Sequence, residues 1–180
     1  MRRRNHFLLL IAILTLGFST NSFAQGDKSK RPSPPAEAKA TVGDLAISIN
    51  YNSPAVKGRK IFGGLEPYDK VWRTGANEAT IFEVNKDVMI NDQKLSAGKY
   101  ALFSIPTENG DWTVIFNKEA NQWGAYNYKE SEDVLRVKVK PGKTAALQER
   151  LDFKIDATNS VGKVIFSWEN VTWSFDVKKA

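Results

Sequence analysis

Residues 100–117, YALFSIPTENGDWTVIFN, contain two short apolar runs separated by turn residues. The first run, residues 100–105, is apolar on both faces, and the second, residues 112–117, places Trp, Val and Phe in alternation with Thr, Ile and Asn. A period of two is typical of β-strands. Pro106 and Asn109-Gly110 lie between the runs, and Asn and Gly tolerate the positive φ angles of tight turns. The stretch therefore predicts two consecutive strands.

The same period recurs along most of the chain. Alternating segments cover residues 45–51, 81–84, 88–90, 134–139, 151–155, 164–168 and 171–177. Only the short Thr144–Arg150 segment has helical propensity, and it lacks room for a long amphipathic helix. Eight or nine short strands with minor helical turns predict an all-β fold, either an antiparallel β-sandwich or a partly closed barrel.

The last two alternating segments differ in phase. Apolar residues occupy even positions from 164 to 168 and odd positions from 171 to 177. A straight strand cannot change phase, so Glu169-Asn170 must be a two-residue turn or a bulge. We expect the turn, which makes this region a hairpin.

The N-terminus has the pattern of a signal peptide. Three arginines precede an apolar run of 12 residues, Phe7–Phe18, and Ser22-Phe23-Ala24 fits a cleavage site. We therefore expect residues 1–24 to be a signal peptide and the protein to be exported, to the periplasm or beyond, with no membrane insertion after cleavage. Residues 25–40 lack large apolar side chains and predict a flexible linker, which leaves residues 41–180 as a single β domain.

Composition narrows the function. Residues 1–24 carry three of the 26 Lys and Arg residues and none of the 20 acidic ones, so the remainder has a net charge of +3. This weak excess argues against nucleic-acid binding. The chain has no cysteine, and its one histidine, His6, lies in the expected signal peptide. The sequence thus predicts no cofactor, no metal site built on Cys or His, and no catalysis by thiol or imidazole.

Residues 51–80 form a long stretch without alternation. It is too rich in aromatic and aliphatic residues to be disordered, and we expect those residues to plug one end of the sheet pair. Lys57 and Arg59 are candidates for binding an anion, although a solvated loop face is the simpler interpretation. Arg73 is expected to pair with Glu78 or Asp69, or else to face a ligand. Asn77 and Glu78 belong to an expected tight turn and are further candidate ligand-binding residues.

Residues 122–128, QWGAYNY, combine three aromatic rings with amide groups outside any clear strand. Aromatic faces provide contact area and amides provide hydrogen bonds, so Trp123 and Tyr126 are candidates for stacking on a sugar or another flat ligand. The alternative is a loop that buries its rings against the edge of the sandwich.

Several of these strings together resemble a known family. They are SPAVKGRKIFGGLEPYDKVWRTGANEAT (53–80), LSAGKYALFSIP (95–106), WTVIFNK (112–118), QWGAYNY (122–128), EDVLRVKVKP (132–141) and SWEN (167–170). The chain resembles exported bacterial proteins catalogued as domain of unknown function 2911. The resemblance implies an exported, mostly β domain and brings no established activity, substrate or catalytic residue.

Three functions remain open from the sequence. The leading hypothesis is an exported non-enzymatic module that binds a small polar or anionic ligand, or a component of the cell envelope, through residues 57–78 and 122–128. The second is a hydrolase of glycans or esters that uses carboxylates, with Glu78 assisted by Arg73, Lys57 or Tyr126. The third is a purely structural envelope protein, in which both loops are packed shut.

Overall fold

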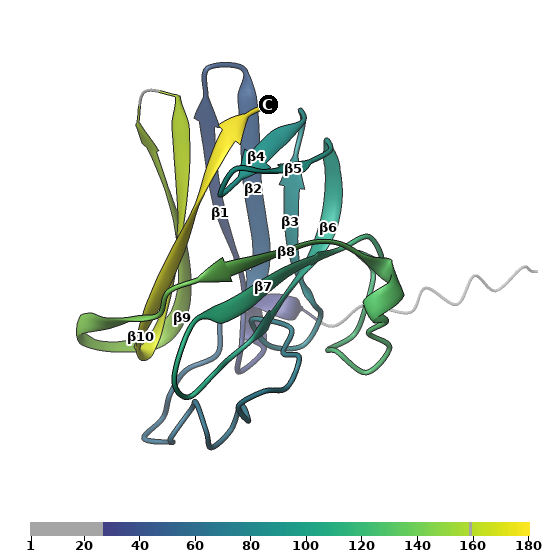
Figure 1. Cartoon of the computed structure of the whole chain (residues 1–180). Coiled ribbons are helices and arrows are strands. Elements are labelled where there is room, and N and C mark those ends of the chain that lie inside the picture. The colour runs from purple at the N-terminus through teal and green to yellow at the C-terminus, as the bar shows by residue number, and fades with distance from the viewer. Residues whose placement is uncertain (1–26, 159) are drawn as a thin grey trace, which may run out of the picture.

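The chain folds into two antiparallel β-sheets packed face to face (Figure 1). The computed structural model describes residues 27–158 and 160–180. One sheet has six strands in the order β1-β2-β3-β6-β7-β8, and the other has four in the order β5-β4-β10-β9. The strands are β1 (Pro35–Val42), β2 (Leu45–Asn52), β3 (Thr80–Val84), β4 (Val88–Ile90), β5 (Gln93–Leu95), β6 (Gly98–Ile105), β7 (Trp112–Asn117), β8 (Asp133–Val139), β9 (Gly142–Thr158) and β10 (Val161–Lys179).

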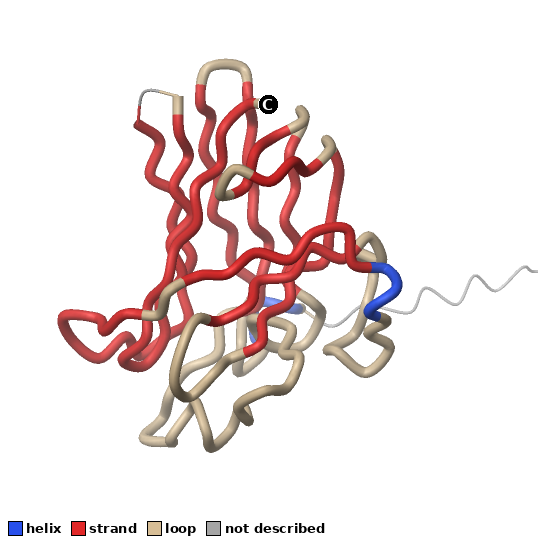
Figure 2. The backbone as a smooth tube through the Cα atoms, in the orientation of Figure 1, coloured by secondary structure: helices blue, strands red, loops and turns tan. Residues whose placement is uncertain are grey.

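The prediction of an antiparallel all-β fold is confirmed. The described chain has ten strands, slightly more than expected, and the sheets form a sandwich that does not close into a barrel. In the part of the chain that the structure describes, helix is confined to two 3-10 turns, η1 (Lys28–Lys30) and η2 (Glu130–Glu132), the short blue segments of Figure 2. Within the described ranges, neither turn has the length or the apolar character of a membrane-spanning helix.

The main core lies between the sheets and is rich in aromatic rings. Phe166 stacks on Trp173 with centroids 4.7 Å apart, and Trp72 stacks on Trp168 at 5.7 Å. Trp72 comes from the long segment between β2 and β3, which also buries Ile61 and Phe62. This segment therefore fills one end of the sandwich, as its apolar content predicts.

The C-terminal hairpin that we expected at Glu169-Asn170 is wrong. Residues 161–179 form one strand, β10, whose pairing with β9 shifts register on both sides of Glu169. Glu169 adopts a φ of +54°. This bulge switches the phase, so that Trp168 before it and Trp173 after it both point into the core. Thr144–Arg150, the segment with helical propensity, lies in β9 because pairing with β10 overrides local preference.

The prediction of a flexible linker over residues 25–40 is also wrong for residues 35–40. Residues 35–40 belong to β1, which pairs with β2 along its whole length. A strand ladder requires only backbone hydrogen bonds, and the small side chains of Ala36 and Ala38 pack against the core. The described domain thus includes residues N-terminal to position 41. The expected signal peptide, residues 1–24, lies outside the described residues.

Candidate functional site

The loop between β7 and β8 covers the outer face of the six-stranded sheet. A second apolar cluster lies there, formed by Ala79, Ala101, Phe103 and Ile115. Tyr128 from the loop packs its ring edge-on against Phe103, with centroids 5.2 Å apart. This contact explains why β6 is apolar on both faces: one face meets the main core and the other meets the loop.

Asn117, at the end of β7, fastens the start of this loop to its end. The side chain is fully buried and makes four hydrogen bonds. Its Nδ2 donates to the Lys129 carbonyl at 3.0 Å and to Asp133 Oδ1 at 2.7 Å. Its Oδ1 accepts from the Glu119 backbone N–H at 3.1 Å and from Gln122 Nε2 at 3.3 Å.

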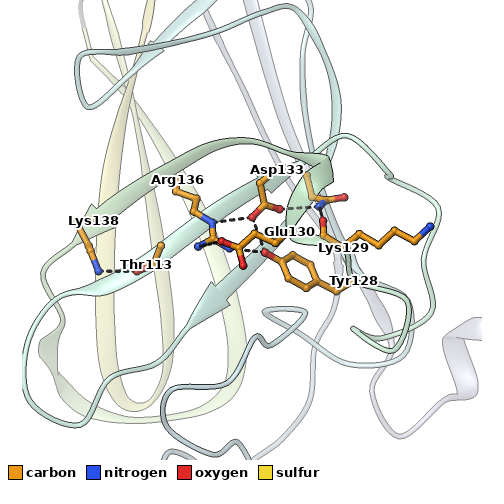
Figure 3. Close-up of polar contacts among 8 residues, drawn as sticks. Thr113, Tyr128, Lys129, Glu130, Asp133, Arg136 and Lys138 are labelled. Atoms are coloured by element: carbon orange, nitrogen blue, oxygen red, sulfur yellow. Dashed lines mark hydrogen bonds and ion pairs between the residues drawn. The ribbon is translucent and has the colours of Figure 1, made fainter.

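A polar network on β8 continues from this amide (Figure 3). Tyr128 Oη donates to Asp133 Oδ2 at 2.5 Å, and Arg136 donates both to that oxygen, at 2.8 Å, and to Tyr128 Oη, at 2.7 Å. Glu130 pairs with Arg136 at 3.1 Å. Burial and the bond to Asp133 raise the pKa of Tyr128 to about 12. The tyrosine therefore stays neutral and holds the loop in place.

The turn at Asn77 brings Glu78 beside Trp123. Asn77 has a φ of +57°, and its carbonyl accepts the Gly124 N–H at 2.9 Å. Glu78 and Trp123 form an isolated antiparallel β-bridge, and the Ala79 N–H donates to the Gln122 carbonyl at 3.0 Å. Three of the candidate residues, Asn77, Glu78 and Trp123, thus come together, although Trp123 lies 45 positions after Glu78 in the chain.

Cations and one amide surround the Glu78 carboxylate. Arg31 Nη1 donates to Oε1 at 3.0 Å and to Oε2 at 2.9 Å, Lys28 Nζ lies 3.2 Å from Oε1, and Asn52 Nδ2 donates to Oε2 at 3.1 Å. Burial alone would raise the pKa of Glu78, but its own backbone N–H and the bonds from Arg31 and Lys28 lower it to about 2. Arg31 also lies over Trp123, with Cζ 5.9 Å from the ring centroid.

Two adjoining hollows flank Glu78, and we call them together the Trp123 groove. The larger, of 390 Å³, is lined by Glu78, Ala79, Ile81, Ala120, Asn121, Gln122 and Trp123. The smaller, of 200 Å³, shares Glu78, Ala79 and Ile81 and adds Lys28, Asn50, Tyr51 and Asn52 among others. Asn52 and Gln122 are each 7% exposed, and their amide oxygens are buried without a hydrogen-bond partner in the described chain. Three other buried polar atoms of the described chain also lack a partner, namely Arg73 Nε and the indole nitrogens of Trp168 and Trp173, so unpaired atoms are not confined to the groove.

A family model describing a protein of unknown function (DUF2911) matches residues 33–177. The chain belongs to this family. The match contains Asn52, Glu78, Gln122 and Trp123 and begins two positions after Arg31. Neither the curated proteins nor the solved structures contain a match to the chain.

In this DUF2911 domain the other predicted residues lie apart from the groove lining. Lys57 and Arg59 line a separate hollow of 250 Å³ together with Pro32, Ser33 and Ala55. The Arg59 guanidinium is held by the carbonyls of Val56, at 3.0 Å, and Ala55, at 2.5 Å. Tyr126 is 83% exposed and does not line either hollow of the groove.

Arg73 lacks the ion pair that we expected. Among the described residues, neither Glu78 nor Asp69 forms an ion pair with it, because Glu78 is occupied by Arg31 and Lys28. The acid that interacts electrostatically with Arg73 is Glu66. Burial raises the pKa of Glu66 to about 7, although Arg73 and Arg59 oppose the shift.

Sequence reasoning did not identify Lys28, Arg31, Asn52 or Gln122 as site residues. Lys28 and Arg31 lie in the segment expected to be a linker, and Asn52 lies at the end of a strand. The only sequence signal was the cluster of cations in an otherwise featureless segment, which does not specify a partner.

Proposed function

We propose that this exported β-sandwich domain binds a small polar ligand in the Trp123 groove. The observation that carries the proposal is a tryptophan, Trp123, that is 53% exposed and lines a hollow beside the Glu78 carboxylate. The larger hollow, 390 Å³, falls within the range of small-molecule sites.

The chemistry of the groove favours a ligand rich in hydrogen-bond donors over an anion. Its accessible functional groups are the Glu78 carboxylate and the electron-rich face of Trp123. Hydroxyl and amino groups complement both, as in a saccharide or an amine with a flat apolar side. The alternative anion site at Lys57 and Arg59 has less support, because carbonyl oxygens already hold the Arg59 guanidinium.

Hydrolysis by Glu78 has less support than binding. A general acid needs a pKa near the working pH, whereas Arg31 and Lys28 help to hold the pKa of Glu78 at about 2. The three proposed helpers, Arg73, Lys57 and Tyr126, do not line the groove. A purely structural role predicts loops without a hollow between them, and the Trp123 groove argues against that reading.

Trp123 supplies its own probe for the test. The other four tryptophans, at positions 72, 112, 168 and 173, are at most 3% exposed, so iodide should quench Trp123 selectively. We expect a saccharide or amine ligand to protect this fluorescence in a saturable way and to shift the indole N–H signal of Trp123 in NMR spectra.

The matched variants are Trp123→Ala and Tyr126→Ala, which remove exposed aromatic rings of the same loop inside and outside the groove. Trp123→Ala should abolish binding measured by calorimetry, and Tyr126→Ala should leave it within about twofold of wild type. Equal losses in the two variants, or a screen of neutral, amino and anionic compounds without any saturable signal, would refute the proposal.

A further inference from the structure

The N-terminal segment Asp27–Pro34, which we call the strap, already places a cation on the groove. Arg31 contacts both oxygens of Glu78 and lies over the Trp123 ring, and Lys28 reaches the same carboxylate. A guanidinium between a carboxylate and an aromatic face makes charge-assisted hydrogen bonds and a cation–π contact at once. The strap thus occupies part of the groove with one specific chemistry.

The strap is joined to the domain by few polar contacts. Every hydrogen bond and ion pair that links residues 27–32 to the rest of the described chain ends on Glu78. No residue of η1 is buried. Firm attachment begins at Ser33 and Pro34, whose carbonyls accept from Asn77 Nδ2 at 3.1 Å and from the Ser53 N–H at 2.8 Å. Residues 27–32 can therefore leave the groove without breaking β1.

Arg31 uses only one of its guanidinium nitrogens to bind the Glu78 carboxylate. One nitrogen, Nη1, serves both carboxylate oxygens, whereas the strongest pairing uses two nitrogens in two parallel bonds. The Arg31 side chain keeps 28% of its surface exposed and the Glu78 side chain 34%. A free guanidinium, unconstrained by the strap backbone, can adopt the two-nitrogen geometry on the same carboxylate.

We propose that Glu78, Trp123 and Asn52 form a binding site for a guanidinium or ammonium group, which Arg31 occupies as an internal ligand until a cationic ligand displaces it. This inference rests on the proposed function and names the ligand class of the same groove. The strap competes with the ligand for the groove within the same chain. The apparent affinity for the ligand therefore equals the intrinsic affinity multiplied by the fraction of molecules in which the strap has left the groove. A ligand without a positive charge cannot form the ion pair that Arg31 makes with Glu78.

The test compares the full chain with the double variant Lys28→Ala/Arg31→Ala. Nα-acetyl-arginine amide, called arginine amide below, is titrated into each protein, with calorimetry and the Trp123 indole N–H signal as readouts. Its uncharged isostere Nα-acetyl-citrulline amide, called citrulline amide below, is titrated in parallel. We expect the double variant to bind arginine amide about tenfold more tightly than the wild type, while citrulline amide shows no gain. Lys30→Ala, which removes a strap cation that does not reach Glu78, is the matched control and should resemble the wild type.

Two further arms define the site and the source of the cation. Adding Glu78→Gln to the double variant should remove the gain, because the carboxylate is lost while the shape is kept. A peptide with the sequence of residues 27–34, DKSKRPSP, should bind the double variant, and the same peptide with Ala for Arg should not. Binding of the peptide alone assigns a chain segment as the ligand, and binding of the amide assigns a small molecule.

The failures of the two proposals are distinguishable. An equal affinity of wild type and double variant for arginine amide, or an equal gain for citrulline amide, overturns the internal-ligand inference. If a neutral saccharide still binds the wild type and fails to bind Trp123→Ala, the proposed function stands even then. If no ligand of any class binds in the groove, both proposals are refuted. Far-UV circular dichroism of each variant verifies that the β-sandwich is intact.

Discussion

Replacing Asn117 with alanine tests whether one buried amide holds the groove loop in place. The substitution removes four hydrogen bonds and leaves their partners behind: the Glu119 N–H, the Gln122 amide, the Lys129 carbonyl and the Asp133 carboxylate. A typical hydrogen bond contributes about 1 kcal/mol net, and a bond to a charged group contributes more. Because the contributions within one network do not add fully, we expect a loss of about 3–4 kcal/mol in the free energy of unfolding.

Urea unfolding measures this loss. A domain of this size has an m-value of roughly 2 kcal/mol/M, so the midpoint should fall by about 1.5–2 M. Two probes separate local from global effects. Far-UV circular dichroism follows the sheets, and iodide quenching of Trp123 in native buffer follows the loop, which should become more accessible because Gln122 precedes Trp123 directly.

Asn127→Ala is the matched control. Asn127 lies in the same loop and is exposed, with no side-chain hydrogen bond in the described part of the chain, so its substitution should change stability by less than about 0.5 kcal/mol. A cost of less than about 1 kcal/mol for Asn117→Ala, or unfolding of both variants at the same urea concentration, would show that Asn117 does not hold the loop.

Three other perturbations follow from the same geometry. The pKa of Glu78 is about 2 in the folded domain and near 4.5 when unperturbed, so its ion pairs stabilise the domain above about pH 4.5, by about 1 kcal/mol after screening by solvent. This contribution to the free energy of unfolding disappears as the pH falls towards 2. Glu78→Gln should therefore flatten the acid limb of a stability–pH curve, and an unchanged limb counts against the pairing. Partial burial raises the pKa of Glu66 to about 7, so wild-type stability should fall as the pH rises from about 4.5 through 7. Glu66→Gln should be more stable than wild type by about 1 kcal/mol at pH 8 but not at pH 4, and equal melting temperatures at pH 8 argue against a desolvated carboxylate. A Cβ on Gly75 would lie 2.8 Å from Thr80 Oγ1, so Gly75→Ala should lower the free energy of unfolding by about 1–3 kcal/mol, measured by thermal unfolding. The control Gly142→Ala, whose Cβ would have no atom closer than 3.7 Å, should be nearly neutral. Similar losses for both variants would contradict the crowding at Gly75.

Local sequence patterns were sufficient to predict most of the strands. Alternation marks β2, β3 and β8 because each has one face in the core, so the pattern records burial directly. β6 is apolar on both faces because its outer face meets the loop between β7 and β8. The alternation of β1 is weak because two of the three side chains that it packs on the core, Ala36 and Ala38, are alanines.

Ambiguity arose where two structures satisfy one pattern. A hairpin and a bulge both explain the phase change at Glu169, and only the pairing of β10 with β9 across that point selects the bulge. Likewise, Thr144–Arg150 has helical propensity that the ladder of β9 overrides. Such choices depend on partners remote in sequence, which a local window does not contain.

The candidate site likewise combines residues that the sequence identified with contacts that only the fold creates. Sequence selected Asn77, Glu78 and Trp123 as residues outside the regular scaffold, and the fold places them side by side. Sequence also suggested Arg73 as the partner of Glu78, whereas Arg31, 47 positions away, takes that place. Nearness in the chain does not imply contact between side chains of a β-sandwich.

By itself, then, the sequence determined the fold class, most of the strand positions and the absence of thiol chemistry, because burial and composition are local properties of the chain. Only the tertiary structure decided the residues that share the Trp123 groove, the cation that neutralises Glu78, and the amide oxygens left unpaired. These depend on strand register and on loops that meet across the sheet, so they are fixed by the free energy of the whole fold and not by any one segment.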